Sequence, residues 1–134
     1  MDSLYARTGF DISRTITRNY STSFFSAVNL LAKDIREAIF GIYGFVRLAD
    51  EIVDSFTDYD RQYLLNRFEQ DYAEAIQQGI STNPVINAFE LTVRKYRIDR
   101  HLIEAFLKSM RADLSHPGYS RKSDIEEYIY GSAS

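Results

Sequence analysis

The 134-residue sequence contains no cysteine and only two histidines, His101 and His116. Without cysteine the chain forms no disulfide and offers no thiolate to a metal, so a reducing compartment such as the cytosol is compatible with it. Zinc sites usually combine several histidine and cysteine ligands, and two imidazoles are too few to build one. A metal bound by this chain is therefore expected to have oxygen ligands.

The sequence also lacks a hydrophobic run long enough to cross a membrane. The longest uncharged stretch, residues 19–32, is polar at its start and shorter than the ~20 apolar residues that a membrane-spanning helix needs. Residues 1–14 carry acids early and have no apolar core, which argues against a signal peptide. We therefore expect a cytoplasmic protein without a transmembrane segment.

Neither sign of charge is in large excess. The formal net charge is -3, with 26% charged and 45% hydrophobic residues. Disordered chains are less hydrophobic and nucleic-acid-binding domains are more basic, so neither class is indicated. A chain of this length buries roughly two-thirds of the surface that it exposes when unfolded, which is enough for a single helical domain over residues 1–134.

Proline and glycine are scarce, with two and six copies, and apolar residues recur at helical spacing between them. This pattern predicts an all-α fold, a helical bundle of about six helices. The first helix is expected over residues 12–31 with Asp11 as its cap, and the last begins near Ser123, where Glu126 completes a capping box. The four helices between them are expected over residues 34–55, 60–78, 84–96 and 100–114.

Four polar residues share one face of the predicted helix 34–55. Tyr43, Arg47, Asp50 and Asp54 are each three or four positions apart, which places them in one row along a helix. An apolar row lies beside them, so we expect the carboxylates to border a cavity. The members of this apolar row are Ile39, Ile42, Val46, Ala49 and Val53.

Asp50 and Asp54 repel each other at this spacing by a few tenths of a kcal/mol, and a divalent cation would reverse the sign. Magnesium is commonly held by one or two carboxylates together with substrate phosphates, so the two aspartates are a candidate magnesium site. The spacing leaves a second interpretation open, in which Arg47 neutralises both aspartates on a solvated helix face. A calcium loop is not expected, because an EF-hand needs a central glycine and a closing glutamate that this region lacks.

Residues 20–56, YSTSFFSAVNLLAKDIREAIFGIYGFVRLADEIVDSF, resemble the opening of the squalene/phytoene synthase family, whose members join two prenyl diphosphates head to head. Within this stretch YSTSF is similar to the family's first flexible segment. The polar row on helix 34–55 fits its Y-x-x-x-R-x-x-D-x-x-x-D pattern. Residues 109–133 are similar to its M-x-x-D-L segment and the following Y-x-Y-x-x-A segment. These sequence motifs are most similar to those of bacterial phytoene synthases.

The resemblance implies an isoprenoid synthase-type fold and a magnesium-dependent condensation of geranylgeranyl diphosphate to phytoene through a cyclopropylcarbinyl diphosphate. It also implies a role for each matching residue, with Tyr43, Arg47, Asp50 and Asp54 as the catalytic set. The implied binding residues are Asp50 and Asp54 for magnesium, Arg47 for diphosphate, Ser21 and Phe24 in the first flexible segment, and Tyr43, Asp113 and Tyr128 around the central cavity.

The family also carries a second aspartate-rich motif on a later helix, and this sequence ends before it. We therefore expect a truncated chain, the amino-terminal part of a squalene/phytoene synthase domain. The alternative is a catalytically silent helical module that binds prenyl diphosphate or self-associates through an exposed apolar face. A helical scaffold without a ligand is a third interpretation. Prenyl chain length, a homodimer and peripheral membrane contact for product release are left open by the sequence.

Overall fold

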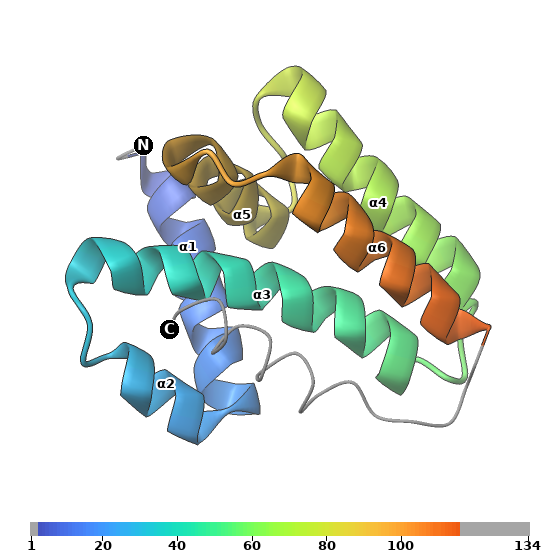
Figure 1. The fold of residues 1–134 in the computed structure, drawn as a ribbon, viewed down its shortest axis with the longest axis horizontal. Coiled ribbons are helices and arrows are strands. Elements are labelled where there is room, and N and C mark those ends of the chain that lie inside the picture. Colours follow the sequence, from blue (N-terminus) through green and yellow to red (C-terminus); the bar gives the residue numbers. More distant parts are fainter. Residues whose placement is uncertain (1–2, 116–134) are drawn as a thin grey trace.

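A computed structural model describes residues 3–115, and within this range all regular structure is helical. The prediction of an all-α fold with about six helices is thereby confirmed, whereas the helix predicted from Ser123 lies outside the described residues. No helix within residues 3–115 is long and apolar enough to span a membrane. The six helices, shown in Figure 1, are α1 (Leu4–Tyr20), α2 (Thr22–Val28), α3 (Lys33–Ser55), α4 (Arg61–Gln78), α5 (Pro84–Tyr96) and α6 (Arg100–Leu114).

The prediction of one helix over residues 12–31, capped by Asp11, is wrong, because two helices occupy this region. The first begins well before Asp11 and is capped by the hydroxyl of Ser3. The backbone is extended at Ser21, with φ -149° and ψ 90°, and the Ser21 hydroxyl accepts a hydrogen bond from the amide of Phe24. A serine that bonds to the backbone in this way ends one helix and starts the next, which apolar spacing alone does not reveal.

The four central helices lie within one residue of their predicted bounds. Side chains of Asp60, Asn83 and Asp99 accept hydrogen bonds from the first turns of α4, α5 and α6. Pro84 occupies the first position of α5, where its missing N–H removes no helical bond. Gly79 ends α4 in the left-handed conformation, with φ 77°. These boundaries were predictable because each has a sequence-local cause.

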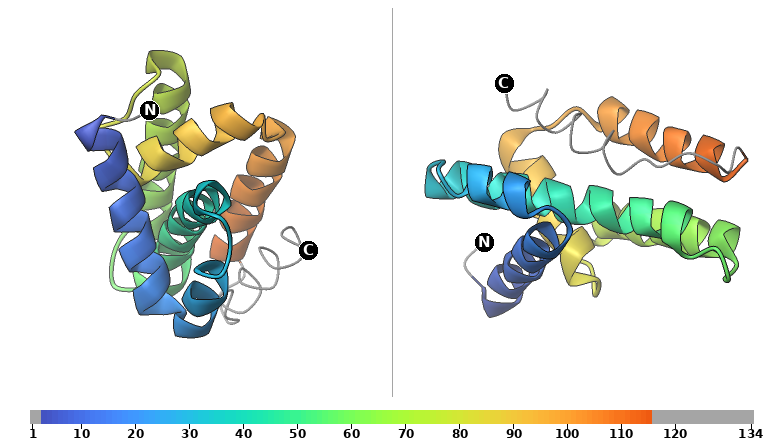
Figure 2. Two further views of the ribbon diagram at one scale, coloured as in Figure 1. Left: turned by 90° about the vertical axis from the view of Figure 1, so that its left-hand side faces the viewer. Right: turned by 90° about the horizontal axis from the view of Figure 1, so that it is seen from below.

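α3 is the central helix and packs against α1, α4, α5 and α6. Figure 2 shows it end-on in the middle of the other helices. A Cβ added at Gly44 would lie 2.6 Å from the Ser13 Oγ of α1, and one at Gly41 would lie 2.8 Å from the Thr92 Oγ1 of α5. These two glycines therefore allow α1 and α5 to cross α3 closely, since a larger residue would push them apart.

An aromatic cluster fixes the other side of α3. Phe45 stacks on Phe89 with ring centroids 3.9 Å apart, and Phe68 and Tyr72 of α4 contact the same ring at 4.9 and 5.3 Å. Burying each ring contributes roughly 1.5–3 kcal/mol, so α3, α4 and α5 are held together by their most apolar residues. The polar row of α3 is thus carried by a helix that is packed along its length.

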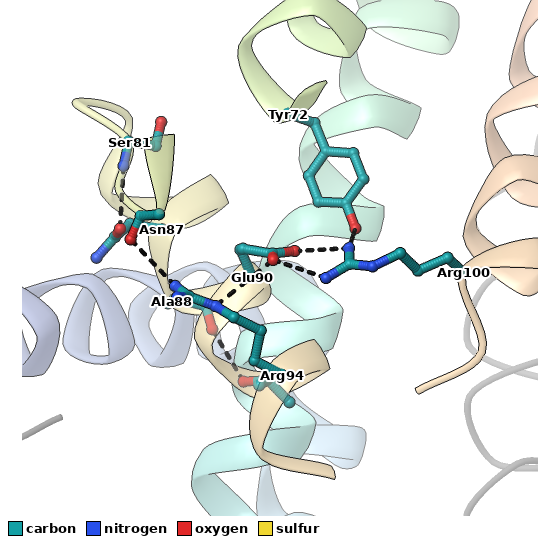
Figure 3. Close-up of polar contacts among 9 residues, drawn as sticks. Tyr72, Ser81, Asn87, Ala88, Glu90, Arg94 and Arg100 are labelled. Atoms are coloured by element: carbon teal, nitrogen blue, oxygen red, sulfur yellow. Dashed lines mark hydrogen bonds and ion pairs between the residues drawn. The ribbon is translucent and has the colours of Figure 1, made fainter. Parts of the chain in front are cut away.

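An ion pair with a buried carboxylate joins α4, α5 and α6 (Figure 3). Glu90 of α5 is 2% exposed, and its two oxygens accept hydrogen bonds from Arg100 at 3.0 and 2.8 Å. Arg100 also donates to the Tyr72 hydroxyl at 2.9 Å, and Arg94 lies 3.5 Å from Glu90. Because Arg100 is the first residue of α6, this cluster fixes where α6 starts relative to α4 and α5.

Candidate functional site

The predicted polar row lies in the buried part of α3. Tyr43 and Asp50 are fully buried, Arg47 is 6% exposed, and Asp54 in the last turn is half-buried. This burial does not fit the interpretation in which the row forms a solvated helix face. Groups that carry charge are rarely buried unless they are paired or bind a ligand, so the surroundings of Arg47 and Asp50 decide what the row can do.

Arg47 is contacted on three sides. One terminal nitrogen, Nη1, donates to Asp50 Oδ2, and the other, Nη2, donates to Glu51 Oε2 at 3.2 Å. The guanidinium carbon lies 4.3 Å from the centroid of the Tyr20 ring, which is the last residue of α1. The Tyr20 hydroxyl hydrogen-bonds Glu51, and this bond raises the pKa of Tyr20. The arginine is therefore held by residues from two helices.

Glu51 and Tyr20 were not among the predicted site residues. Glu51 sits inside the motif between two aspartates, and a glutamate at i+4 from Arg47 is also what an ordinary surface pair would show. Tyr20 precedes the helix break at Ser21, which the sequence did not indicate. Tyr20 could have been identified only by predicting the break, since the break sets where the end of α1 meets α3.

Asp50 is a buried carboxylate with incomplete hydrogen bonding. Its Oδ1 has no hydrogen-bond partner among residues 3–115, and the same holds for the Nε of Arg47. Burial raises the pKa of Asp50 to about 7, the negative charge of Asp54 adds to the rise, and Arg47 opposes it. At neutral pH this group is near its midpoint of titration, so any added cation would favour its charged form.

The two aspartates fit a divalent cation with oxygen ligands. They lie one turn apart, the charge of Asp54 raises the pKa of Asp50, and one oxygen of Asp50 has no hydrogen-bond partner among residues 3–115. Within residues 3–115 there is no group of three or more histidine, cysteine or acidic side chains arranged to hold a metal ion. Two carboxylates suit magnesium, which retains water ligands and completes its shell with phosphate oxygens.

The start of α2 packs against the polar row. Phe24 of α2 is 1% exposed and stacks on Tyr43 of α3, with ring centroids 5.3 Å apart. Ser21 is 7% exposed, and its hydroxyl caps α2. The structure thus brings Phe24 into contact with Tyr43, and it gives Ser21 a structural role in the helix break.

Asp113 lies in the last turn of α6 and is half-buried. α6 packs against α3, and both helices end at the same side of the molecule (Figures 1 and 2). Asp54 and Asp113 are therefore each near the carboxyl end of one of two neighbouring helices, where the helix dipole disfavours negative charge. Tyr128 lies outside the described residues.

An apolar groove of about 600 Å³ runs along the adjoining face of α3. Ile39, Ile42 and Val46 from the predicted apolar row line it together with residues of α5 and α6. The four residues of the polar row do not line this groove. The carboxylates and the groove therefore lie on neighbouring faces of one helix.

Residues 17–134 match the squalene/phytoene synthase family, and the chain belongs to this family. It is 28% identical to the phytoene synthase of Rhodobacter capsulatus over 127 residues, which cover 93% of this chain and 37% of that protein. It is 27% identical to the phytoene synthase of Arthrospira platensis over 122 residues, covering 90% of this chain and 39% of the relative.

The presqualene diphosphate synthase of Rhodopseudomonas palustris is 30% identical over 95 residues, which cover 69% of this chain and 33% of that protein. The chain thus spans less than two-fifths of the length of these three relatives. No solved structure matches the chain significantly. The family resemblance drawn from the motifs is confirmed.

Proposed function

We propose that the chain serves in a magnesium-dependent, head-to-head condensation of two prenyl diphosphates, with geranylgeranyl diphosphate converted to phytoene. Membership of the squalene/phytoene synthase family supports this, as do the names of the relatives, two phytoene synthases and a presqualene diphosphate synthase. Residues 1–134 would form one helical domain, the amino-terminal part of the synthase. Its contribution to the enzyme would be the metal and diphosphate site on α3.

The observation that carries the proposal is the state of Asp50. This carboxylate is fully buried, has an oxygen without a partner among residues 3–115, and lies one turn from a second aspartate. Asp50 and Asp54 would hold the ion, and Arg47 would add a permanent positive charge against the diphosphate. When bound, magnesium would neutralise the negative charge that builds on the leaving diphosphate.

The chemistry requires no covalent intermediate with the protein, which would position the substrates, exclude water and stabilise charge. One prenyl diphosphate loses pyrophosphate, the double bond of the second attacks the allylic cation, and loss of a proton to the released pyrophosphate closes the cyclopropane of the cyclopropylcarbinyl diphosphate. Loss of the second pyrophosphate, rearrangement with ring opening and loss of a second proton would then give phytoene. The stacked rings of Phe24 and Tyr43 would exclude water and stabilise positive charge through their faces. Ser21, Asp113 and Tyr128 are proposed to line the substrate cavity, and the apolar groove is a candidate for the prenyl chain.

The direct test is to incubate the purified chain with radiolabelled geranylgeranyl diphosphate and magnesium and to extract the products. Phytoene is the expected product if this segment is active by itself. Calorimetry with a non-hydrolysable prenyl diphosphate tests the site without turnover, and magnesium-dependent binding is expected in either case. The Asp50→Ala, Asp54→Ala double variant should lose this dependence, while Asp58→Ala, at an exposed position beyond α3, should retain it. Equal affinity in the double variant would remove the proposed metal role.

A second candidate function is binding of prenyl diphosphate without turnover, or self-association. The observation that favours it is the apolar groove, which includes the exposed side chains of Ile35 and Leu102. Such a surface favours contact with another apolar surface. Sedimentation of the purified chain over a range of concentrations would reveal self-association, and absence of product with retained magnesium-dependent binding would support the silent module.

A further inference from the structure

Arg47 lies among several carboxylates of α3, and its contacts with them bear on its role. One guanidinium faces the carboxylates of Asp50 and Glu51, and Asp54 adds a third carboxylate within reach of Asp50. Arg47 is 6% exposed, and its Nε has no partner among residues 3–115. Arginine presents five N–H donors in a fixed fork, so a buried guanidinium that bonds two carboxylates still has donors left for a further anion.

Binding of a divalent cation by the two aspartates would change this arrangement. Asp50 would then give its charge to the metal, and the bond from Arg47 Nη1 to Asp50 would weaken. A buried cation that loses its partner is costly, so Arg47 would otherwise move away from the site. Among residues 3–115, the contacts of Arg47 that do not involve a metal ligand are the bond from Nη2 to Glu51 and the stacking on Tyr20.

We propose that Glu51 and Tyr20 are positioning residues that keep the Arg47 guanidinium beside the two aspartates after a cation has bound there, with its remaining N–H groups available to a diphosphate. The geometry supports this division of roles, because Glu51 holds one terminal nitrogen while the Tyr20 ring covers the guanidinium face. The hydrogen bond between Tyr20 and Glu51 links the two supports to each other. The inference rests on the proposed function of Asp50 and Asp54.

A rival explanation makes the opposite prediction. If Glu51 were only a competing negative charge, its removal would release Arg47 and lower the repulsion of an incoming anion. Pyrophosphate would then bind more tightly to a Glu51→Gln variant. If Glu51 positions Arg47, the same variant binds pyrophosphate more weakly, although it carries one negative charge less. The sign of the change separates the two explanations.

The test is calorimetric titration of the purified chain with inorganic pyrophosphate at saturating magnesium. We expect Glu51→Gln to weaken binding about tenfold and Tyr20→Leu to weaken it several-fold. Tyr20→Phe should recover most of the loss seen with leucine, since it retains the ring that stacks on Arg47. Asp58→Asn is the matched control for loss of a negative charge, because Asp58 is exposed and lies just beyond α3.

A double-mutant cycle with Arg47 separates positioning from general damage to the fold. In an Arg47→Met background, Glu51→Gln should cause no further loss of pyrophosphate affinity, because there is no guanidinium left to position. An equal loss in both backgrounds, or tighter binding by Glu51→Gln in the native background, would overturn the inference. Tyr20→Phe and Glu51→Gln keep the size of the side chain, so they test the idea even if Tyr20→Leu unfolds.

Failure of the inference and failure of the proposed function are distinguished by the aspartate variants in the same titration. If pyrophosphate binding is lost in Asp50→Asn and Asp54→Asn but is insensitive to Glu51→Gln, only the positioning role is wrong. If binding does not depend on the aspartates at all, the proposed function fails first.

Discussion

Glu90 and Asp50 are both buried carboxylates on neighbouring helices, yet their surroundings differ. Both oxygens of Glu90 are bonded to Arg100, and Arg94 lies close by. Arg47 donates to Asp50 Oδ2, while Asp50 Oδ1 has no hydrogen-bond partner among residues 3–115, and burial raises the pKa of Asp50 to about 7. Burial of a charge costs several kcal/mol and is offset only by complete pairing. Glu90 therefore serves the fold, whereas a ligand could supply the partner that Asp50 Oδ1 lacks among residues 3–115.

The local balance of charge explains the difference. Two arginines contact the single carboxylate of Glu90, whereas Arg47 bonds one oxygen of Asp50 and is shared with Glu51. The two arginines neutralise Glu90 without a ligand. At Asp50 one buried carboxylate oxygen has no hydrogen-bond partner among residues 3–115, which is destabilising unless a ligand binds. A residue arrangement that lowers stability at one place is common where a protein binds its substrate.

The largest expected effect on stability is at the Glu90 cluster, in which both carboxylate oxygens are paired. Arg100→Met should lower the free energy of unfolding by about 3 kcal/mol, because Glu90 remains buried with a weaker partner. Urea denaturation should show a lower midpoint with an unchanged slope. The control is Arg67→Met, which breaks an exposed pair with Asp71 and should cost less than about 1 kcal/mol. Equal losses in the two variants would contradict the account of the Glu90 cluster.

At Asp50 a substitution should change the free energy of unfolding in the opposite direction. Asp50→Asn should raise the free energy of unfolding of the metal-free chain at pH 8 by about 2 kcal/mol, since it removes a buried charge without leaving a cavity. The amide can still accept a hydrogen bond from Arg47. Chemical denaturation in the presence of a chelator measures the difference, and a clear destabilisation would show that Asp50 is adequately paired without a metal.

The dependence of stability on pH should reflect the same group. The folded-state pKa of Asp50, about 7, is above its ordinary value of 3.8, so the folded chain binds this proton more tightly than the unfolded chain. The associated stability is present below about pH 4 and is lost as the pH rises through 7, a fall of roughly 2–4 kcal/mol. Denaturation of the metal-free chain from pH 5 to 8 should show this fall, and Asp50→Asn should flatten it. Parallel curves for the two proteins would rule out Asp50 as the source.

A smaller effect on stability is expected at Tyr72, which contacts Arg100 of the Glu90 cluster. Tyr72→Phe removes the hydroxyl that accepts a hydrogen bond from Arg100 and keeps the ring among the core aromatics. The loss should be about 1 kcal/mol, the usual value for one such bond. Burial raises the pKa of Tyr72, so the native chain should also lose stability above about pH 10, and the phenylalanine variant should lose less. Thermal denaturation at pH 8 and pH 10.5 tests both points.

The fold was predictable where its causes are local in sequence. Apolar periodicity and the breaks at Gly79 and Pro84 located the central helices to within one residue, and the structure adds the caps at Asp60, Asn83 and Asp99 that fix three of their starts. The break at Ser21 was missed, because apolar residues continue at helical spacing on both sides of it. The break there depends on one hydrogen bond, in which the Ser21 hydroxyl accepts from the Phe24 amide, and a single bond leaves no periodic pattern in the sequence.

The candidate site was predictable only along one helix. The spacing of Arg47, Asp50 and Asp54 on α3 and the family motif identified the polar row. The contribution of Tyr20 and the completeness of the Glu90 cluster depend on how distant helices meet. No spacing rule connects residue 90 with residue 100 across a turn, or residue 20 with residue 47 between helices. Charge balance in three dimensions, which separates the two clusters, is therefore visible only after folding.

The central claim is that Asp50 and Asp54 hold a divalent cation, and magnesium titration of the purified chain followed by calorimetry and by the thermal midpoint tests it most directly. The native chain should bind magnesium and melt at a higher temperature in its presence, as any ligand of the folded state produces. Asp50→Asn and Asp54→Asn should lose both effects, while Glu90→Gln, at the other buried carboxylate, should retain them. Magnesium binding that survives both aspartate substitutions, or no binding by the native chain, would contradict the account.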